Sequence, residues 1–380
     1  MKKPGGEIRM CVDYRTLNSL TLNDIYPMPR VDEIVDAISP AKFITTLDLA
    51  KGYYQVPLAE SAIPKTAFVT PQGKFEFTAL PFGLKNAPAC FQRLMDSVLG
   101  GEKSAMAYID DVVVHSATWS QHLLDLEKTL RRLQEAGLTV KQRKCTFAGA
   151  TVPFLGHVVG RSEVRPQDAK IAAIQNYQLP KTKKDLRAFL GLIGYYRKFI
   201  PNFSSRSVNL TDLTKANNPD KLRMEPFHLA EFQDLRDAIT SDSVLAAFQP
   251  ELPTQLHTDA SDRGIGGCLV QLHPDGQERP VAFYSRKLFP RECRYTVTEK
   301  ECLAAVDSVR HFQAYLLGAP FQLVTDHKAL TSLQHMTGGG ARVTRWALSL
   351  QPFSYSVIHR PTAVHLLKDR LFSLCPNIRS

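Results

Sequence analysis

The chain lacks the cysteine patterns on which secreted and zinc-binding domains depend. Its seven cysteines are odd in number and scattered, and no two of them form a C-x-x-C pair. This pattern argues against a disulfide framework and against a zinc site, and it predicts reduced thiols inside a cell. The composition is equally compatible with a cytoplasmic particle and with the nucleus.

Long apolar runs are also missing. No stretch approaches the roughly 20 residues that cross a bilayer, and Met1–Gly6 does not lead into the apolar core of a signal peptide. We therefore expect a soluble protein with no membrane partner. The chain contains no fixed-period repeat and no low-complexity tract, and its 380 residues suffice for two or three domains with separate cores.

Acidic residues are outnumbered by basic ones. The chain contains 47 Lys and Arg against 37 Asp and Glu, which gives a formal net charge of +10 and a pI near 9.2. Such an excess favours a polyanionic partner, and nucleic acid is preferred over a membrane surface.

Two adjacent aspartates, Asp110 and Asp111, interrupt the apolar and β-branched run Ala107–Val114. The pattern predicts two short strands that meet at a tight turn, with both carboxylates at its tip. Phe43–Leu49 has a similar composition and adds Asp48 near the end of another buried strand. By itself an Asp-Asp pair is most often a solvated turn. Three carboxylates at strand ends can, however, hold two Mg²⁺ ions about 3.5–4 Å apart, the arrangement used for phosphoryl transfer.

A second set of carboxylates follows in the C-terminal part, where a new α/β pattern begins at Thr254. The pattern predicts one strand that ends in Asp259 and another that ends in Asp326. Between them, the glycine-rich segment Gly264–Gly267 leads into a return strand.

The segment Thr298–Leu317 has the apolar periodicity of a helix. We expect Thr298 to cap this helix and Glu301, three residues later, to complete a capping box. Glu301 therefore has a structural explanation as well as a metal-binding one.

A basic helix is predicted to open at Lys181. It contains Arg187, Gly191 and Tyr195, which are four residues apart and so share one face. A glycine between a cation and an aromatic ring leaves room for close approach to a duplex minor groove. Alternatively, Gly191 and Gly194 allow helices to pack. The segment Glu163–Arg206 holds nine Lys and Arg against three Asp and Glu, which favours phosphate contacts.

Five motifs occur in one order along the chain: V-D-Y-R-T-L-N from Val12, L-D-L-A-K-G-Y-Y from Leu47, L-P-F-G-L-K-N-A-P from Leu80, Y-I-D-D from Tyr108 and F-L-G-H from Phe154. With these motifs the chain resembles the reverse transcriptases of Gypsy-type long-terminal-repeat retrotransposons, which are relatives of the retroviral enzymes. The resemblance extends over essentially the whole chain. It implies an α+β polymerase palm with partial fingers and a helical thumb, followed by an α/β RNase H-like domain with a mixed sheet.

The resemblance also implies domain boundaries. Residues 1–162 would form the partial fingers and palm, and residues 163–214 the thumb. The polar, proline-broken segment 215–253 would be a connection, and residues 254–380 the RNase H-like domain.

By the same resemblance, Asp48, Asp110 and Asp111 are the metal-binding carboxylates of the polymerase, with Asp48 and Asp110 as the principal ligands. Tyr53 matches the aromatic gate that stacks under the sugar and excludes a 2′-hydroxyl, although core packing is its alternative role. Phe82 borders the incoming nucleotide at a position where retroviral enzymes often have Gln.

Further nucleic-acid contacts follow from the resemblance. Lys3 and Arg9 match basic fingers residues that bind the triphosphate, with solvated surface charges as the alternative. A complete enzyme of this family has more fingers elements before this point, so we expect a fragment of a longer polyprotein or a truncated copy.

Phe154, Leu155 and Gly156 match the primer grip, for which an ordinary buried hairpin is the alternative. Arg187, Gly191 and Tyr195 would contact the template–primer from the thumb.

In the C-terminal domain the resemblance implies an RNase H tetrad of Asp259, Glu301, Asp326 and Asp369. His359 fits the loop histidine that assists product release or proton transfer, with a purely structural role as the alternative. Asp369 departs from the family pattern because Lys368 precedes it directly, where the family usually has a small residue. This lysine would either pair with Asp369 and weaken the site or face away from it.

The expected function is RNA-directed DNA synthesis coupled to degradation of the RNA strand of RNA–DNA hybrids. Each active site would use two Mg²⁺ ions, with Mn²⁺ as a possible substitute. The partners would be an RNA template, a DNA primer, the RNA–DNA hybrid and dNTPs, and no feature of the sequence specifies an oligomeric state. Two alternatives stay open: a degenerate element-derived protein that binds nucleic acid without turnover, and an active RNase H beside a polymerase disabled by its missing fingers.

Overall fold

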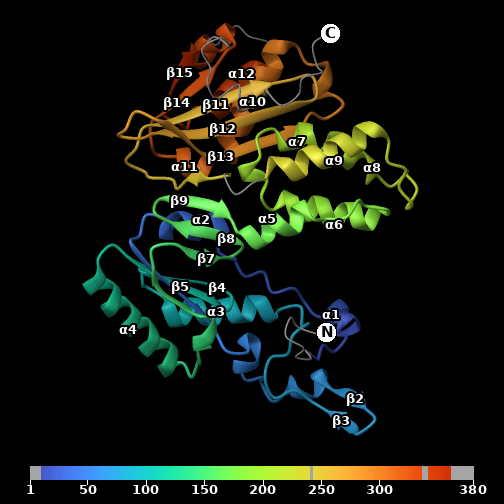
Figure 1. Ribbon diagram of the computed structural model, residues 1–380, viewed down its shortest axis with the longest axis vertical. Helices are drawn as coiled ribbons and strands as arrows, with labels where there is room; N and C mark the ends of the chain where they lie inside the picture. Colours follow the sequence, from blue (N-terminus) through green and yellow to red (C-terminus); the bar gives the residue numbers. More distant parts are fainter. Residues whose placement is uncertain (1–9, 240–242, 336–340, 361–380) are drawn as a thin grey trace. The chain divides into compact units, whose positions relative to one another are not determined.

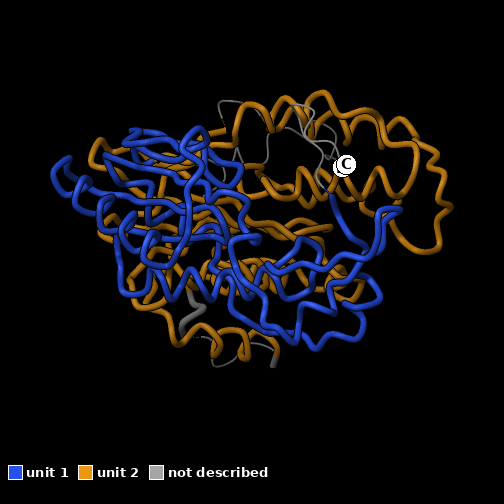
Figure 2. The backbone as a smooth tube through the Cα atoms, turned by 90° about the horizontal axis from the view of Figure 1, so that it is seen from below, with its two compact units in different colours: residues 1–162 blue, residues 163–380 orange. Residues whose placement is uncertain are grey.

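The computed structural model describes residues 10–239, 243–335 and 341–360, and its chain divides at Ser162 and Glu163 into two compact units (Figures 1 and 2). The finer boundaries expected at residues 214 and 253 stay predictions. Within the described ranges, no helix is both long enough and apolar enough to cross a membrane.

The first unit is built on an antiparallel sheet of four strands in the order β4-β5-β1-β6. The strands are β1 (Phe43–Asp48), β4 (Ala105–Tyr108), β5 (Asp111–Ser116) and β6 (Thr146–Gly149). Helices α3 (Ala87–Leu99) and α4 (Trp119–Glu135) pack against this sheet. Val112, Val113 and Val114 of β5 are all fully buried, so the middle of the strand is covered on both faces.

Shorter elements complete the first unit. They are α1 (Arg15–Leu20), α2 (Val31–Ile38), the 3-10 helices η1 (Gly52–Gln55), η2 (Ile63–Thr66) and η3 (Gln142–Lys144), and the hairpins β2 (Phe68–Thr70) with β3 (Gly73–Phe75) and β7 (Val152–Phe154) with β8 (His157–Gly160). The last hairpin turns through Leu155 and Gly156, whose φ angles are +43° and +79°. Such left-handed pairs form two-residue hairpin turns, and the hairpin expected from the sequence is therefore present.

The N-terminal half of the second unit contains a helical layer. Its helices are α5 (Asp168–Gln175), α6 (Lys183–Gly194), α7 (Phe203–Arg206), α8 (Val208–Leu213) and α9 (Pro226–Ala238), with the 3-10 helix η4 (Arg197–Phe199) between α6 and α7. A capping box of Thr182 and Asp185 starts α6. The segment 215–253, expected as a connection, contains α9, and the ring of Phe232 on α9 lies 4.6 Å from that of Phe189 on α6.

A mixed sheet of five strands forms the rest of the second unit, in the order β13-β12-β11-β14-β15. The strands are β11 (Thr254–Ala260), β12 (Gly264–Leu272), β13 (Glu278–Lys287), β14 (Phe321–Thr325) and β15 (Tyr355–His359). The pairs β11–β14 and β14–β15 are parallel and the others antiparallel, which confirms the expected mixed sheet.

Helix α10 (Val297–His311) lies across β11 and β12, and its apolar stripe, including Cys302, Ala305 and Val309, enters the core. Helix α12 (Ala341–Ser349) packs on α10. The remaining elements of this unit are β9 (Glu163–Pro166), which pairs with β10 (Leu245–Ala246), α11 (Gln313–Leu316), and the 3-10 helices η5 (Glu292–Arg294) and η6 (Lys328–His335).

Candidate active sites

The two adjacent aspartates lie at the tip of a β-hairpin, as the strand pattern predicts. β4 ends at Tyr108, β5 begins at Asp111, and Ile109 and Asp110 form the turn between them. Ile109 has a φ of +57°, a left-handed conformation that strains a β-branched residue. Asp48 is the direct antiparallel partner of Asp111 across β1 and β5. The three carboxylate residues therefore share one end of the sheet.

The backbone that follows β1 is held on two sides. Leu49 N donates to Asp110 O at 3.2 Å, and Lys141 N donates to Asp48 O at 2.8 Å. Gly52, with a φ of +46°, lies so close that a Cβ on it would be 3.0 Å from Asp110 Oδ2. A side chain at this position would force the Asp110 carboxylate to shift by a few tenths of an ångström, and its positive φ would be strained, so Gly52 leaves room for the carboxylate where it lies.

Lys144 is a residue of this site that the sequence reasoning missed. Its Nζ lies 2.6 Å from Asp48 Oδ2. Lys144 ends η3, just before β6, and β6 pairs with β1, so sheet pairing brings the lysine back to the aspartates. The cluster of basic residues Lys141, Arg143 and Lys144 is the signal for it that the sequence offered.

The carboxylates of this site interact electrostatically. The pKa of Asp111 is raised from its ordinary value of 3.8 to about 6, chiefly by burial and then by the neighbouring charges of Asp110 and Asp48, which outweigh the lowering effect of Lys144. The negative charge here is thus incompletely compensated by the protein, as expected of a place that a cation would neutralise.

This pKa shift leads to a prediction about stability without divalent cations. Below pH 3.8 the Asp111 proton is bound in both the folded and unfolded chains. Between pH 3.8 and about 6 only the folded state keeps it, so the free energy of unfolding falls as the pH rises through this window. We expect a loss of about 1–2 kcal/mol, after allowance for solvent screening.

Denaturant unfolding of the wild type and of Asp111→Asn in EDTA, from pH 4 to pH 8, would measure this effect. Groups that do not interact with Asp111 contribute equally to both proteins and cancel in the difference, which leaves Asp111 and its coupling to Asp110 and Asp48. Curves that stay parallel across the whole range would contradict the prediction.

Tyr53 and Phe82, expected at the nucleotide, lie against each other beside this site. Their ring centroids are 5.1 Å apart, and the Tyr53 ring also lies 5.5 Å from that of Phe91, which is fully buried. Tyr53 and Phe82 are half-buried. Tyr53 thus has the packing role considered from the sequence, and part of its surface remains exposed. Lys3 and Arg9 lie outside the described residues.

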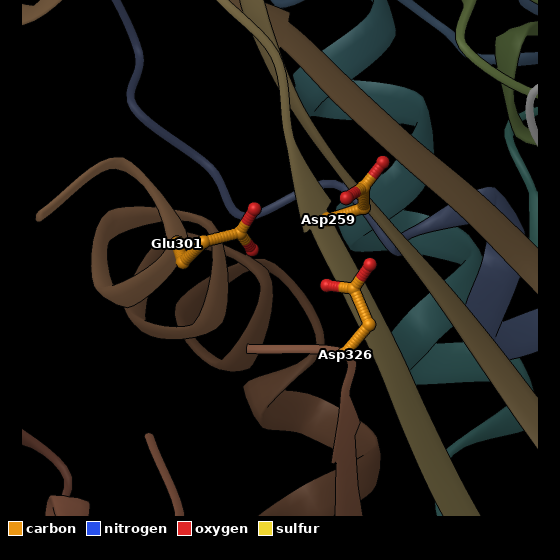
Figure 3. Close-up of side chains that lie close together, drawn as sticks. All are labelled: Asp259, Glu301 and Asp326. Atoms are coloured by element: carbon orange, nitrogen blue, oxygen red, sulfur yellow. The ribbon is translucent and has the colours of Figure 1, made fainter. Parts of the chain in front are cut away.

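The second group of carboxylates is in the five-stranded sheet. Asp259 lies near the end of β11, Asp326 directly follows β14, and Glu301 is on α10. Their side chains point toward one another (Figure 3), and one oxygen of each lies within 4.8 Å of the others. The parallel pairing of β11 and β14, in which His257 is opposite Val324, places the two aspartates at the same edge of the sheet.

The capping box expected at Thr298 and Glu301 is wrong by two residues. Thr296 caps α10 and Glu299 completes the box: Thr296 N donates to Glu299 Oε2 at 2.9 Å, and Glu299 N donates to Thr296 Oγ1 at 3.3 Å. The pattern T-x-x-E occurs twice in overlap here, and local sequence cannot choose between the two. Glu301 is instead 5% exposed and accepts a hydrogen bond from Ala260 N at 3.3 Å. The capping explanation for Glu301 is thereby removed.

His359 lies beside the same carboxylates. It is paired with Thr325 across the parallel strands β14 and β15, and its Nε2 lies 3.0 Å from Asp326 O. Because a carbonyl only accepts, this contact requires the proton on Nε2. Asp369, the fourth member of the expected tetrad, lies outside the described residues.

Helix α6 presents Arg187, Gly191 and Tyr195 on its exposed face, opposite the buried Leu186 and Phe189. A Cβ on Gly191 would meet nothing within 4 Å, so helix packing does not explain this glycine. Arg187 Nη2 donates to Thr214 O at 2.8 Å, which orders the cation on the surface.

The expected primer-grip residues lie on the β7–β8 hairpin. Phe154 is 3% exposed and packs in the interior, whereas Leu155 and Gly156 form the half-exposed turn. The packing alternative therefore applies to Phe154, and the turn residues are the ones available at the surface.

Two family models match the chain. "Reverse transcriptase (RNA-dependent DNA polymerase)" matches residues 1–159, and "RNase H-like domain found in reverse transcriptase" matches residues 249–353. The first contains Asp48, Asp110 and Asp111, and the second contains Asp259, Glu301 and Asp326.

Curated relatives are similar along nearly the whole chain. A retrovirus-related Pol polyprotein from transposon 297 of Drosophila melanogaster is 37% identical over 94% of the chain, and the Tf2-3 transposon polyprotein of Schizosaccharomyces pombe is 32% identical over 97%. The chain spans only 34% and 28% of the lengths of these two relatives.

Solved structures share the fold. A foamy viral protease-reverse transcriptase in complex with double-stranded DNA matches with a TM-score of 0.81 and 25% identity, over 95% of this chain and 76% of that one. The foamy viral protein in complex with an RNA/DNA hybrid matches with a TM-score of 0.77 and 25% identity, over 95% of this chain and 49% of that one.

Proposed function

Because the chain belongs to the reverse transcriptase–RNase H region of LTR-retrotransposon Pol polyproteins, we propose that it synthesises DNA on an RNA template and degrades the RNA strand of the resulting hybrid. One observation carries this proposal: each of the two units has its own group of three carboxylate residues, which lie at strand ends in the first unit and at two strand ends and on α10 in the second. Two chemically separate phosphodiester reactions are the function that such a pair of sites supports best.

Both groups consist of carboxylates, which suit the divalent cations that reverse transcriptases and RNases H use, and among the described residues it is the second group whose ligand atoms are already close together. Carboxylate oxygens are the ligands that Mg²⁺ and Mn²⁺ prefer, and Asp259, Glu301 and Asp326 already bring theirs within 4.8 Å of one another. Asp48 and Asp110 would be the principal ligands in the polymerase site, with Asp111 beside them. Bound there, two Mg²⁺ ions per site would activate the attacking hydroxyl or water and neutralise charge on the phosphate.

The protein's own side chains would contribute to DNA synthesis by positioning the metal-binding carboxylates and the dNTP. The turn at Ile109 places Asp110 at the tip of the hairpin, and Gly52 leaves room for its carboxylate beside the loop after β1. Lys144 supplies a cation next to Asp48. Tyr53 and Phe82 would form the apolar wall for the sugar and base of a dNTP, with Lys3 and Arg9 at its triphosphate.

In the RNase H site, Glu301 is held by the backbone of Ala260, one residue beyond Asp259. His359 is fixed beside Asp326 through the Asp326 carbonyl, a position from which it would assist proton transfer or product release. Asp369 would complete the ligand set.

The nucleic-acid partners would be an RNA template, a DNA primer and their hybrid. The similar foamy viral proteins were solved with double-stranded DNA and with an RNA/DNA hybrid. The exposed face of α6 suits a duplex because Arg187 and Tyr195 flank an unobstructed glycine. The Leu155–Gly156 turn would contact the primer strand. Recognition of backbone and helix shape would make binding largely independent of sequence.

Two substitutions of Gly191 are predicted to change the stability of the fold and the affinity for a hybrid separately. Gly191→Ala should stabilise the fold by up to about 1 kcal/mol, because alanine is the better helix former and its Cβ has free space. Gly191→Leu should fold equally well but lower the affinity for an RNA–DNA hybrid about tenfold or more, because its side chain occupies the space for the duplex. Thermal unfolding and fluorescence-anisotropy titration would measure the two effects. Unchanged affinity of a folded Gly191→Leu protein would exclude α6 from the duplex interface.

The experiment that tests the proposed function follows a labelled DNA primer on a labelled RNA template with Mg²⁺ and dNTPs, scoring extension and RNA cleavage together. Both products are expected. Cleavage alone would identify an RNase H beside an inactive polymerase. Salt-dependent hybrid binding without either product would refute the catalytic proposal and identify a nucleic-acid-binding protein.

An intracellular location, in a cytoplasmic particle or in the nucleus, stays a proposal based on the scattered cysteines. Fractionation of cells that express the tagged protein would test it.

A further inference from the structure

The edge strand β13 of the five-stranded sheet is fastened to the helical layer of the same unit (Figure 1). Ser204 on α7 donates from its backbone N to Ser285 Oγ at 3.0 Å and from its Oγ to Ser285 O at 2.8 Å. Arg197 on η4 donates to the same carbonyl through Nη2. Ser285 is only 4% exposed, so these contacts are shielded from water and well defined.

An ion pair lies farther along the same strand. Lys287 Nζ on β13 lies 2.9 Å from both carboxylate oxygens of Asp212 on α8. We call this set of contacts, formed by Arg197, Ser204 and Asp212 with Ser285 and Lys287, the α7–β13 interface.

Two glycines of the neighbouring strand β12 leave the space that α7 and the residues before it occupy. Gly264 and Gly266 on β12 are two residues apart and therefore face the same side of the sheet. A Cβ on Gly264 would lie 3.2 Å from Ser205 Oγ, and one on Gly266 would lie 3.2 Å from Asn202 Oδ1. The glycine-rich segment seen in the sequence thus permits the helical layer to lie directly on the sheet.

The interface lies in register with the RNase H carboxylates. Across the three strands β11, β12 and β13, Asp259 is paired with Gly266, and Gly266 is paired with Ser285. Ser285, which the helical layer contacts, is therefore two strand spacings of about 4.8 Å each away from Asp259, a proposed metal ligand. The backbone hydrogen bonds of the ladder make this connection stiff.

The same interface is directly continuous with α6. This helix ends at Gly194, and η4, which carries Arg197, begins three residues later. A second connection runs from Arg187 of α6 to Thr214 at the end of α8, the helix that carries Asp212. Both routes join the exposed face of α6 to β13 through short, hydrogen-bonded steps.

We propose that the α7–β13 interface fixes the spacing between the duplex-binding face of α6 and the RNase H carboxylates, and so determines where along a hybrid the RNA strand is cut. This inference rests on the function proposed above. It assigns Ser204, Ser285, Asp212 and Lys287 as positioning residues, none of which touches the carboxylates. An interface that only stabilised the fold would leave the position of cleavage unchanged when weakened.

The test compares the wild type with a protein carrying Ser204→Ala and Lys287→Met. Arg279→Met serves as the matched control, because Arg279 is also on β13 but pairs with Asp275 in the β12–β13 hairpin, away from α7. The substrate is a 5′-labelled RNA annealed to a shorter DNA with a recessed 3′ end, in Mg²⁺ without dNTPs. Thermal unfolding verifies that all three proteins are folded at the assay temperature.

We expect the wild type and Arg279→Met to cut mainly at one distance from the DNA 3′ end. In the double variant the fraction cut at this position should fall at least about twofold, with products spread over neighbouring positions, because a loosened support misplaces the substrate. The total rate of cleavage should stay within about twofold of wild type, since the altered residues are distant from the chemistry.

The outcomes are distinct. An unchanged, sharp cleavage position in the folded double variant would overturn the proposal, and so would scattered cleavage by the wild type. Equal broadening in Arg279→Met would also overturn it, by showing that any weakening of β13 has this effect. Absence of all RNA cleavage in the wild type would refute the proposed RNase H function itself.

Discussion

Asp110→Asn is expected to reduce RNA-templated primer extension by about 10³-fold, equivalent to about 4 kcal/mol of transition-state stabilisation, and to leave RNA cleavage within about twofold of wild type. The reason is that Asp110 is held at the tip of the β4–β5 turn, directly against Gly52, where an amide has the shape of the carboxylate but not its charge. The RNase H carboxylates belong to the other unit and are untouched. Single-turnover extension of a labelled primer, with cleavage scored in the same reaction, measures both rates.

The effect of the same substitution on stability separates loss of a ligand from loss of the fold. Asp110 raises the pKa of its neighbour Asp111 by like-charge repulsion, so its neutralisation should leave the melting temperature in EDTA unchanged or higher. Glu127→Gln, at an exposed position of α4 where Glu127 pairs with Arg131, serves as a control outside the site. Extension by Asp110→Asn at more than a tenth of the wild-type rate would show that this carboxylate is not a principal ligand.

Glu301→Gln is expected to have the complementary effect. RNA cleavage should fall by about 10²- to 10³-fold, while primer extension stays within about twofold. Glu301 is buried among Asp259 and Asp326, and its neutral amide would remove one of the three charges that hold a cation there. Cleavage of a labelled RNA–DNA hybrid in Mg²⁺ is the measurement.

Glu299→Ala is a matched control two residues away on the same helix. It removes the capping box with Thr296 and the ion pair with Arg342, so it should lower the free energy of unfolding by about 1 kcal/mol while cleavage is retained. The reverse result, stability lost in Glu301→Gln and cleavage lost in Glu299→Ala, would restore the capping-box interpretation of Glu301.

Much of the fold could be predicted from the sequence because its signals are local. The β-branched runs around Asp48 and Asp110, the turn at Leu155 and Gly156, and the capped start of α6 each depend on neighbouring residues alone. Such signals determine where strands, turns and helices form. They also placed the carboxylates at strand ends, which is why the sequence could indicate two acidic sites.

Local signals were insufficient where two patterns overlap. The two T-x-x-E patterns at the start of α10 are equally good capping boxes as local sequence. Packing decides between them, because Glu301 is buried and bonded to Ala260, whereas Glu299 forms the capping box. The segment 215–253, expected as a connection, contains α9, whose Phe232 packs on Phe189 of α6, a contact that no local pattern specifies.

By itself, then, the sequence determined the order of elements, the identity of the acidic residues and the family that they resemble. Only the tertiary structure decided which distant residues join them. Lys144 reaches Asp48 because β6 pairs with β1, and Ser285 comes into register with Asp259 because β12 pairs on both sides. Strand pairing between segments far apart in the chain depends on the whole packed core, and no short stretch of sequence encodes it.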